Sequence, residues 1–333
     1  MLQVSVNLKA NQYRLHSQVP NYKMVKVAIA GGTGDVGQTI LEVIKDNPSH
    51  EVVVLTRKPT DTVLGASAVG VDYTDVDILR RVLEEKNIHT VICALETHSE
   101  GGSKAQINLI KASAACTKTK RFIPSAFSIA YPQETFGKDP MFKGYFAAVA
   151  ELKKTDLQWT VIANGIFLDY FAISRIKSYL KPFPMVIDIE NRMAAIPGDG
   201  NVPISFTYSF DMAKFVVASL DLDEWPEESR MAGDTLTWNE FVQLAESVTG
   251  SKFNVVYDDV EKLKRSEVTA LPIYAMVYDL IPKAQFHAMT AMFGLWSQDA
   301  KMVSVPPEVN AKFPDIQPLT AKGLLEKYWQ SKA

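Results

Sequence analysis

A glycine-rich turn at residues 31–37, with the sequence GGTGDVG, has the residue types and spacing that could hold a phosphate group. Apolar residues 25–30 precede the turn, and residues 38–45 follow it with Ile40, Val43 and Ile44 on one helical stripe. A strand, a glycine turn and a helix N-terminus together direct backbone amides and a helix dipole at an anion. Glycines also serve in ordinary tight turns, but the flanking pattern favours a dinucleotide-binding loop. The residues of this loop that are predicted to contact the dinucleotide are Gly31, Thr33, Gly34, Asp35, Val36 and Gly37.

Two cations, Arg57 and Lys58, follow the second apolar run at residues 51–55. A site specific for NAD usually has Asp or Glu at this place, because a carboxylate accepts hydrogen bonds from the ribose 2′-hydroxyl. An arginine can instead bind a 2′-phosphate with a bidentate fork and stack on the adenine. A solvated basic loop is the alternative, and we favour NADP(H) as the cofactor. Asp72 is a further candidate contact for the adenine, or a structural turn residue.

Alternating strands and helices must position these residues. Apolar runs near residues 25–30, 51–55, 68–71, 90–95, 121–125 and 159–163 alternate with helical patterns near 38–45, 77–86, 105–115 and 142–154. This alternation predicts an α/β fold with a Rossmann-type, doubly wound parallel sheet. In such sheets the ligand lies beyond the carboxyl ends of the strands. The rule adds Leu95, Ser125 and Asn164 as cofactor contacts, and Phe127 and Phe167 as substrate contacts.

The chain divides into three predicted parts. Residues 1–23 contain no acidic residue and lack the apolar core of a signal peptide, so we interpret them as an extension outside the fold. We predict an NAD(P)-binding Rossmann domain over residues 24–165 and a smaller, partly helical substrate domain over residues 166–333. Some segments of the second domain could return to the Rossmann sheet.

Within this second part the pattern predicts several elements. A helix is expected to run from residue 168 towards Leu180 and to carry Tyr170 as a substrate contact. Short strands are expected at residues 193–197 and 203–206. Thr237 and Glu240 have the spacing of a capping box, for a helix that ends at Gly250.

Composition excludes several classes of protein. The 333 residues are 47% hydrophobic and carry a net charge of −3, which gives no electrostatic reason to expect nucleic acid or an anionic membrane as partner. No apolar run approaches the roughly 20 residues needed to cross a bilayer. Cys93 and Cys116, the only cysteines, lie in apolar or helical runs, which favours two buried, reduced thiols. We predict a cytoplasmic monomer or homodimer with a small-molecule substrate and no nucleic-acid or membrane partner.

Several motifs together resemble one family. They are the glycine loop at residues 31–37, Arg57, RFIPSAF at 121–127, Trp159-Thr160 and NGIFLDY at 164–170. In combination they resemble the NmrA-like, isoflavone-reductase-like branch of the atypical short-chain dehydrogenases, from about residue 24 to the C-terminus and most strongly before residue 220. The resemblance implies a Rossmann fold, NADPH, and reduction of a small, often aromatic substrate. It also implies a lysine, on the helix before the sixth strand, that assists proton transfer.

The sequence departs from that pattern at the lysine. Counting back without gaps from Trp159, Tyr145 stands in the lysine's place, and Lys143 lies about 200° away around a helix. Tyr145 could donate a proton if a nearby cation or the cofactor lowered its pKa, or it could pack on the nicotinamide as an aromatic ring. Ala126 also stands where these reductases commonly have a glutamate. Tyr145 and Lys143 are the two predicted catalytic residues.

Other catalytic patterns are absent from the sequence. It has no G-x-S-x-G or H-E-x-x-H motif, and its five histidines are scattered singly, so no metal site is predicted. Only His98 follows the end of a predicted strand. It is either a surface-loop residue or an acid that faces the substrate.

We therefore predict an enzyme, an NADPH-dependent oxidoreductase that reduces a small aromatic or conjugated carbonyl compound. Two alternatives stay open. A non-catalytic NAD(P) sensor that acts through a protein partner is favoured by the absence of the family's lysine. A non-redox isomerase or cyclase could use the same fold, because the fold alone does not decide the chemistry.

Overall fold

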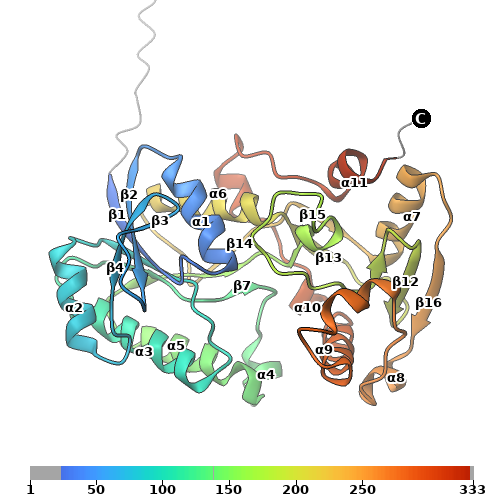
Figure 1. Cartoon of the computed structure of the whole chain (residues 1–333), viewed down its shortest axis with the longest axis horizontal. Helices are drawn as coiled ribbons and strands as arrows, with labels where there is room; N and C mark the ends of the chain where they lie inside the picture. Colours follow the sequence, from blue (N-terminus) through green and yellow to red (C-terminus); the bar gives the residue numbers. More distant parts are fainter. Residues whose placement is uncertain (1–23, 138, 331–333) are drawn as a thin grey trace, which may run out of the picture.

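The computed structural model describes residues 24–137 and 139–330, so the predicted extension at residues 1–23 lies outside the described residues (Figure 1). Its centre is a seven-stranded sheet with the order β3-β4-β2-β1-β5-β6-β8. These strands are β1 (Val25–Ala30), β2 (His50–Thr56), β3 (Thr62–Val63), β4 (Ala66–Gly70), β5 (Thr90–Cys93), β6 (Arg121–Ile123) and β8 (Gln158–Trp159). All neighbours pair in parallel except β3 with β4.

The first strand lies at the middle of the sheet. It pairs with β2 on one side and β5 on the other, and Ala30 at its end is level with both Leu55 and Cys93. The carboxyl ends of the three strands therefore meet at one edge. This order, which extends outward from β1 in both directions, confirms the predicted doubly wound Rossmann-type fold.

Helices cover both faces of the sheet (Figure 1). On one face α2 (Val76–Glu85), α3 (Glu100–Ala115) and α5 (Lys143–Leu152) pack in a row, and on the other α1 (Asp35–Lys45) packs against α6 (Ser209–Ala218). A hydrophobic core lies on each face of the sheet, and the side chains of β1 alternate between them. Val27 and Ile29 pack on the α1 side, and Ala28 and Ala30 pack on the α3 side. Burial of both faces explains why the strands read as continuous apolar runs.

The strand predicted at residues 159–163 is two strands. β8 ends at Trp159, and β9 (Val161–Ala163) pairs in a separate sheet with β7 (Phe127–Ser128) and β14 (Glu228–Arg230). The partner strand β6 ends before Pro124, which has no backbone N–H and cannot continue the ladder. Thr160, at the break, donates a hydrogen bond to Ser229 Oγ at 2.9 Å.

The helix predicted from residue 168 towards Leu180 is wrong. A short 3-10 helix covers only Leu168–Phe171, after β10 (Ile166–Phe167), and irregular chain continues to β11 (Ile187–Asp188). The cause is the buried carboxylate of Asp169, which accepts hydrogen bonds from Ser178 Oγ at 2.6 Å and from the Ser209 backbone N–H at 2.8 Å. In a helix, residues 169 and 178 would be about 13.5 Å apart along the axis. The chain therefore bends back to satisfy Asp169.

The second half contributes two more small sheets and several helices. The strands are β12 (Met193–Pro197), β13 (Ile204–Thr207), β15 (Asp234–Leu236) and β16 (Asn254–Asp258). The helices are α7 (Trp238–Thr249), α8 (Val260–Lys264), α9 (Lys283–Trp296), α10 (Ala300–Val303) and α11 (Ala321–Trp329), with α4 (Gln133–Phe136) in the first half. Further 3-10 turns cover Pro140–Phe142, Ser219–Asp221, Pro272–Val277 and Asn310–Lys312.

The predicted capping box is confirmed, because Thr237 and Glu240 satisfy each other's backbone N–H and Gly250 ends α7 with φ of 65°.

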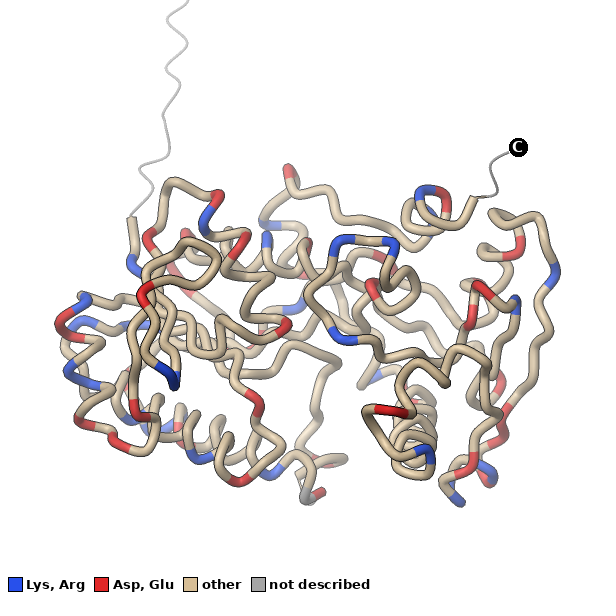
Figure 2. Tube along the Cα trace, viewed as in Figure 1, with Lys and Arg blue, Asp and Glu red and all other residues tan. Residues whose placement is uncertain are grey.

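The predicted environment of the two cysteines can also be checked. Cys93 and Cys116 are both buried and both free, as expected. Basic and acidic residues are interspersed along the trace (Figure 2). Within residues 24–137 and 139–330, no helix is both long and apolar enough to cross a membrane.

Candidate active site

The glycine loop forms a tight cradle between β1 and β5. Gly31 has φ of +83°, and a Cβ there would lie 2.4 Å from the Ala94 carbonyl oxygen. A Cβ on Gly37 would lie 2.1 Å from the Gly31 carbonyl oxygen, so α1 starts directly against the loop. Gly34 is the N-cap of α1 and provides no side-chain cap, which leaves the amides of the first turn without one. Uncapped amides and missing side chains fit the pyrophosphate of a dinucleotide.

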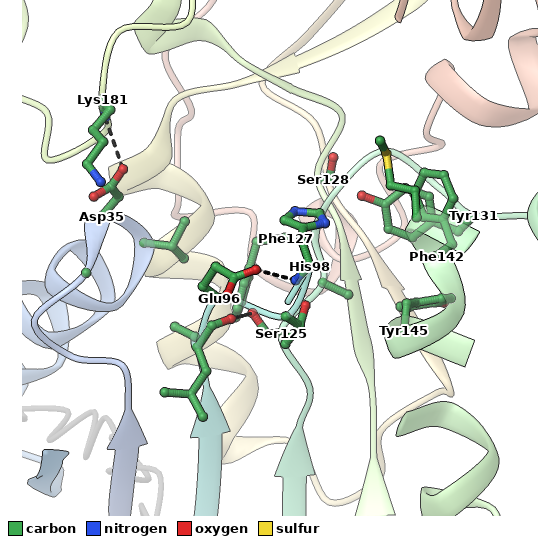
Figure 3. Close-up of a pocket in the computed structure, with 17 residues that line it drawn as sticks. Asp35, Glu96, His98, Ser125, Phe127, Ser128, Tyr131, Phe142, Tyr145 and Lys181 are labelled. Carbon is green, nitrogen blue, oxygen red and sulfur yellow. Dashed lines mark hydrogen bonds between the residues drawn. The ribbon is translucent and has the colours of Figure 1, made fainter. Parts of the chain in front are cut away.

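A cavity of about 500 Å³ opens at the carboxyl ends of the strands (Figure 3). Seven of the predicted site residues line it, namely Gly34, Asp35, Val36, Leu95, Ser125, Phe127 and Tyr145. The remaining lining residues are Ala94, Glu96, Thr97, His98, Ala126, Ser128, Tyr131, Met141, Phe142 and Lys181. The strand-end rule therefore locates a cavity that joins the start of α1 to the loops after β5 and β6.

The two loops at the floor of the cavity are fixed to each other. Ser125 Oγ donates a hydrogen bond to the Leu95 carbonyl oxygen at 2.8 Å, and the Ser125 N–H donates to Gln106 Oε1 at 2.7 Å. Beneath them, burial raises the pKa of the Cys93 thiol to about 12, so this residue stays a neutral thiol. Ser125 thus shapes the floor with its hydroxyl hydrogen already engaged.

Glu96 and His98 lie on the loop that leads into α3. The Glu96 carboxylate accepts hydrogen bonds from Ser99 Oγ at 2.7 Å, from the Ser99 N–H at 2.9 Å and from the His98 N–H. Partial burial opposes them, but these bonds hold the pKa of Glu96 below its usual range. Glu96 therefore stays anionic and cannot serve as a proton donor near neutral pH. The His98 imidazole lies in the middle of the cavity (Figure 3).

The wall opposite α1 is aromatic (Figure 3). The Tyr131 ring lies 4.8 Å from that of Phe142 and 5.0 Å from that of Tyr145, measured between ring centroids. Behind them Trp296 of α9 packs 5.3 Å from Phe142, so the second half of the chain supports this wall. Aromatic faces of this kind favour an apolar, ring-containing ligand.

A glycine brings Tyr145 to the cavity. A Cβ on Gly144 would lie 2.8 Å from both the Thr97 carbonyl oxygen and Ser103 Oγ, so α5 can approach the loop after β5 only at a glycine. Lys143, at the first position of α5, is exposed and does not line the cavity. The structure therefore brings Tyr145 into the site and leaves Lys143 outside it.

The surroundings of Tyr145 favour its neutral form. Burial raises the pKa of the phenol, and the nearby Glu228 carboxylate and Tyr131 raise it further. No cation contributes to this shift. The phenol therefore keeps its proton at neutral pH.

Arg57, Lys58 and Asp72 lie at the same sheet edge but outside the cavity lining. Both basic side chains are exposed on the loop after β2, which Thr56 Oγ1 closes by donating to the Lys58 carbonyl oxygen at 2.7 Å. Asp72 accepts hydrogen bonds from the Thr74 N–H and Oγ1, at 2.8 and 2.7 Å, and they lower its pKa. Asp72 therefore has a structural partner in its turn.

Asn164, Phe167 and Tyr170 also lie outside the cavity lining. Asn164 is fully buried, with its Nδ2 donating to the Gly165 carbonyl oxygen at 3.1 Å. Phe167 is buried and Tyr170 half-buried, 6.2 Å apart between ring centroids. In the glycine loop, Gly34 lines the cavity. Its neighbours Gly31, Thr33 and Gly37 do not line it.

Sequence reasoning missed Tyr131, Phe142 and Lys181. The density of aromatic residues between 131 and 146 was a usable signal for the first two. Lys181 had no such signal, because it lies in irregular chain. Within the described residues, no group of three or more His, Cys, Asp or Glu side chains could hold a metal ion.

Comparison with known proteins places this geometry in a family. The family model described as NmrA-like matches residues 23–318. The oxidoreductase BOA1 of Botryotinia fuckeliana is 37% identical over 233 residues, which cover 69% of this chain and 78% of that protein. The oxidoreductase swnN of Metarhizium robertsii is 31% identical over 337 residues, which cover 93% and 98%. The solved binary complex of leucoanthocyanidin reductase with NADPH from Vitis vinifera has the same fold, with a TM-score of 0.65, 21% identity and coverage of 91% and 99%. The chain therefore belongs to the NmrA-like family.

Proposed function

We propose that this protein is an NADP(H)-dependent oxidoreductase that reduces a small aromatic or conjugated carbonyl compound. The observation that carries the proposal is the cavity that joins the uncapped N-terminus of α1 to the aromatic wall of Tyr131, Phe142 and Tyr145. Relatives named as oxidoreductases support the reaction class. Solved complexes of the same fold with NADPH and with NADP⁺ support the cofactor.

Each part of the cofactor has a corresponding part of the chain. The glycine loop at residues 31–37 would hold the pyrophosphate, and Arg57 would pair with the 2′-phosphate. Leu95 and Ser125, on the floor, would border the nicotinamide end. Bound NADPH supplies a hydride, and the protein supplies position and a proton.

Two side chains that face the cavity can supply the proton. Tyr145 is on the aromatic wall, but its raised pKa weakens it as an acid. His98 is on the opposite loop and lines the same cavity, and histidine is the residue that most often acts as a general acid in enzymes. Replacing each separately, as Tyr145→Phe and His98→Gln, tests which one acts. The donor's variant should lose turnover with unchanged NADPH affinity, whereas Lys143→Ala should retain both.

The first test is a parallel titration of the protein with NADPH, NADP⁺, NADH and NAD⁺. We expect NADPH and NADP⁺, which carry a 2′-phosphate, to bind more strongly than NADH and NAD⁺. Of the two, NADPH should bind more strongly. A screen of aromatic aldehydes, ketones and enones, followed by NADPH absorbance, then tests reduction. Absence of binding by any dinucleotide would contradict the proposal at its base.

A second candidate function is a redox sensor that binds the dinucleotide without turnover. The observation that favours it is the position of Lys143 outside the cavity, together with the raised pKa of the tyrosine in the lysine's place. A sensor is expected to prefer NADP⁺ over NADPH and to be inactive across the carbonyl screen. Turnover of any carbonyl that depends on His98 or Tyr145 would exclude it.

A further inference from the structure

Residues 177–181, which we call the strap, lie across helix α1. Lys177 forms an ion pair with Glu42 of α1, and the Tyr179 hydroxyl donates to the second Glu42 oxygen at 2.7 Å. The Lys181 N–H donates to Asp35 Oδ2, at the first residue of α1, at 3.1 Å. The strap is thus attached to α1 at two points that are about 10.5 Å apart along the helix axis.

These attachments leave one cation facing the cavity. Lys181 is attached through its backbone N–H, so its side chain takes no part in holding the strap. Among the described residues that line the cavity, Lys181 is the one Lys or Arg. Its side chain runs beside Asp35 at the α1 end of the cavity, away from Tyr145 (Figure 3).

The charge balance at this end of the cavity needs a cation. Asp35 places a carboxylate in the first turn of α1, next to the loop that suits a pyrophosphate. Two phosphate charges near that carboxylate would repel it, and the helix dipole offsets only part of this repulsion. The Lys181 ammonium, beside Asp35 at this end of the cavity, can compensate the charge of both the carboxylate and the phosphates.

We propose that Lys181 pairs with the pyrophosphate of the bound dinucleotide, from its position beside Asp35 at the N-terminus of α1. This inference rests on the proposed function, because it requires a dinucleotide in the glycine loop. It gives the two phosphate-bearing parts of NADPH different cations. Arg57 serves the 2′-phosphate, which only NADP(H) has, and Lys181 serves the pyrophosphate, which NADPH and NADH share.

The test is a fluorescence titration with NADPH and with NADH, on the intact chain and on Lys181→Met. Methionine has a similar length and retains the backbone N–H, so the strap stays attached to Asp35. An exposed, charge-assisted contact predicts a Kd that rises roughly 3- to 10-fold for both dinucleotides. The dependence of NADPH binding on salt should become less steep, and Lys181→Arg should restore most of the affinity. Lys111→Met is the matched control, with the same loss of charge at an exposed lysine of α3 outside both the cavity and the strap, and should change either Kd less than about twofold.

The possible results separate the alternatives. Equal weakening of both dinucleotides by Lys181→Met, with rescue by arginine, supports the inference. Unchanged affinity for both, in a wild-type chain that binds NADPH, overturns the role of Lys181 and leaves the proposed function intact. Weaker binding of NADPH alone overturns the inference as well, because Lys181 would then contact the 2′-phosphate and not the pyrophosphate. Absence of dinucleotide binding by the wild-type chain overturns both proposals.

Discussion

Replacement of Gly37 by alanine is the sharpest test of the cradle. The new Cβ would lie 2.1 Å from the Gly31 carbonyl oxygen and 2.9 Å from Gly32 Cα, whereas ordinary contacts begin near 3.4 Å. Both obstacles are backbone atoms, so the start of α1 must move by roughly 1 Å to make room. Overpacking of this kind costs about 1–3 kcal/mol, and the lack of a flexible neighbour favours the upper half of that range. We expect the free energy of unfolding to fall by about 2–3 kcal/mol.

The same displacement should weaken cofactor binding. A shift of about 1 Å takes an amide-to-phosphate hydrogen bond beyond its normal length, so we expect the Kd for NADPH to rise at least tenfold. Gly101→Ala is the matched control, because Gly101 also lies in the first turn of a helix, α3, and a Cβ there meets nothing within 4 Å. That variant should be neutral, or more stable by up to about 1 kcal/mol. Urea unfolding and NADPH titration measure both effects, and equal behaviour of the two variants would refute the reasoning.

Three further predictions follow from contacts described above. Arg57→Ala should raise the Kd for NADPH about tenfold with little change for NADH, since it removes a charged contact to the 2′-phosphate; equal losses in parallel titrations would remove that role. Asp169→Ala should lower the free energy of unfolding by about 3 kcal/mol in urea, because Ser178 and Ser209 lose a buried acceptor; wild-type stability would show that the bend at residue 168 does not depend on it. Stability should decline as the pH rises above about 10, because the unfolded chain releases phenol protons there that the folded chain retains. Burial raises the pKa of several tyrosines, most strongly Tyr73, Tyr145, Tyr170, Tyr208 and Tyr274, so their contribution is fully present below pH 10; urea midpoints that stay constant from pH 8 to 11 would contradict it.

Local patterns predicted most of the fold. The Rossmann-type sheet follows from apolar runs and glycine turns, and the capping box at Thr237 is complete within four residues, so neither needs information from elsewhere in the chain. The errors occur where a contact with a residue far away in the sequence determines the local backbone structure. The helix predicted after residue 168 fails because Asp169 must meet Ser209, 40 positions later. The strand at residues 159–163 divides because its neighbour ends before Pro124.

The candidate site shows the same division. Gly34, Leu95 and Ser125 were predictable, because strand ends of a parallel sheet must meet at one edge. Lys181 was not, because it reaches the cavity through irregular chain that is attached to α1 by Glu42 and Asp35. No periodicity or spacing encodes such an attachment.

The two sides of the cavity come from separate stretches of the chain. The cradle is made by residues 31–37, and the aromatic wall by Tyr131, Phe142 and Tyr145 with support from Trp296. Mutations that enlarge, shrink or recharge the wall therefore need not touch the cradle. Such a division makes the protein evolvable, since new ligand preferences can be selected one wall residue at a time while the cradle is preserved. It also suggests a route for engineering, in which Tyr131, Met141 and Phe142 are randomised together.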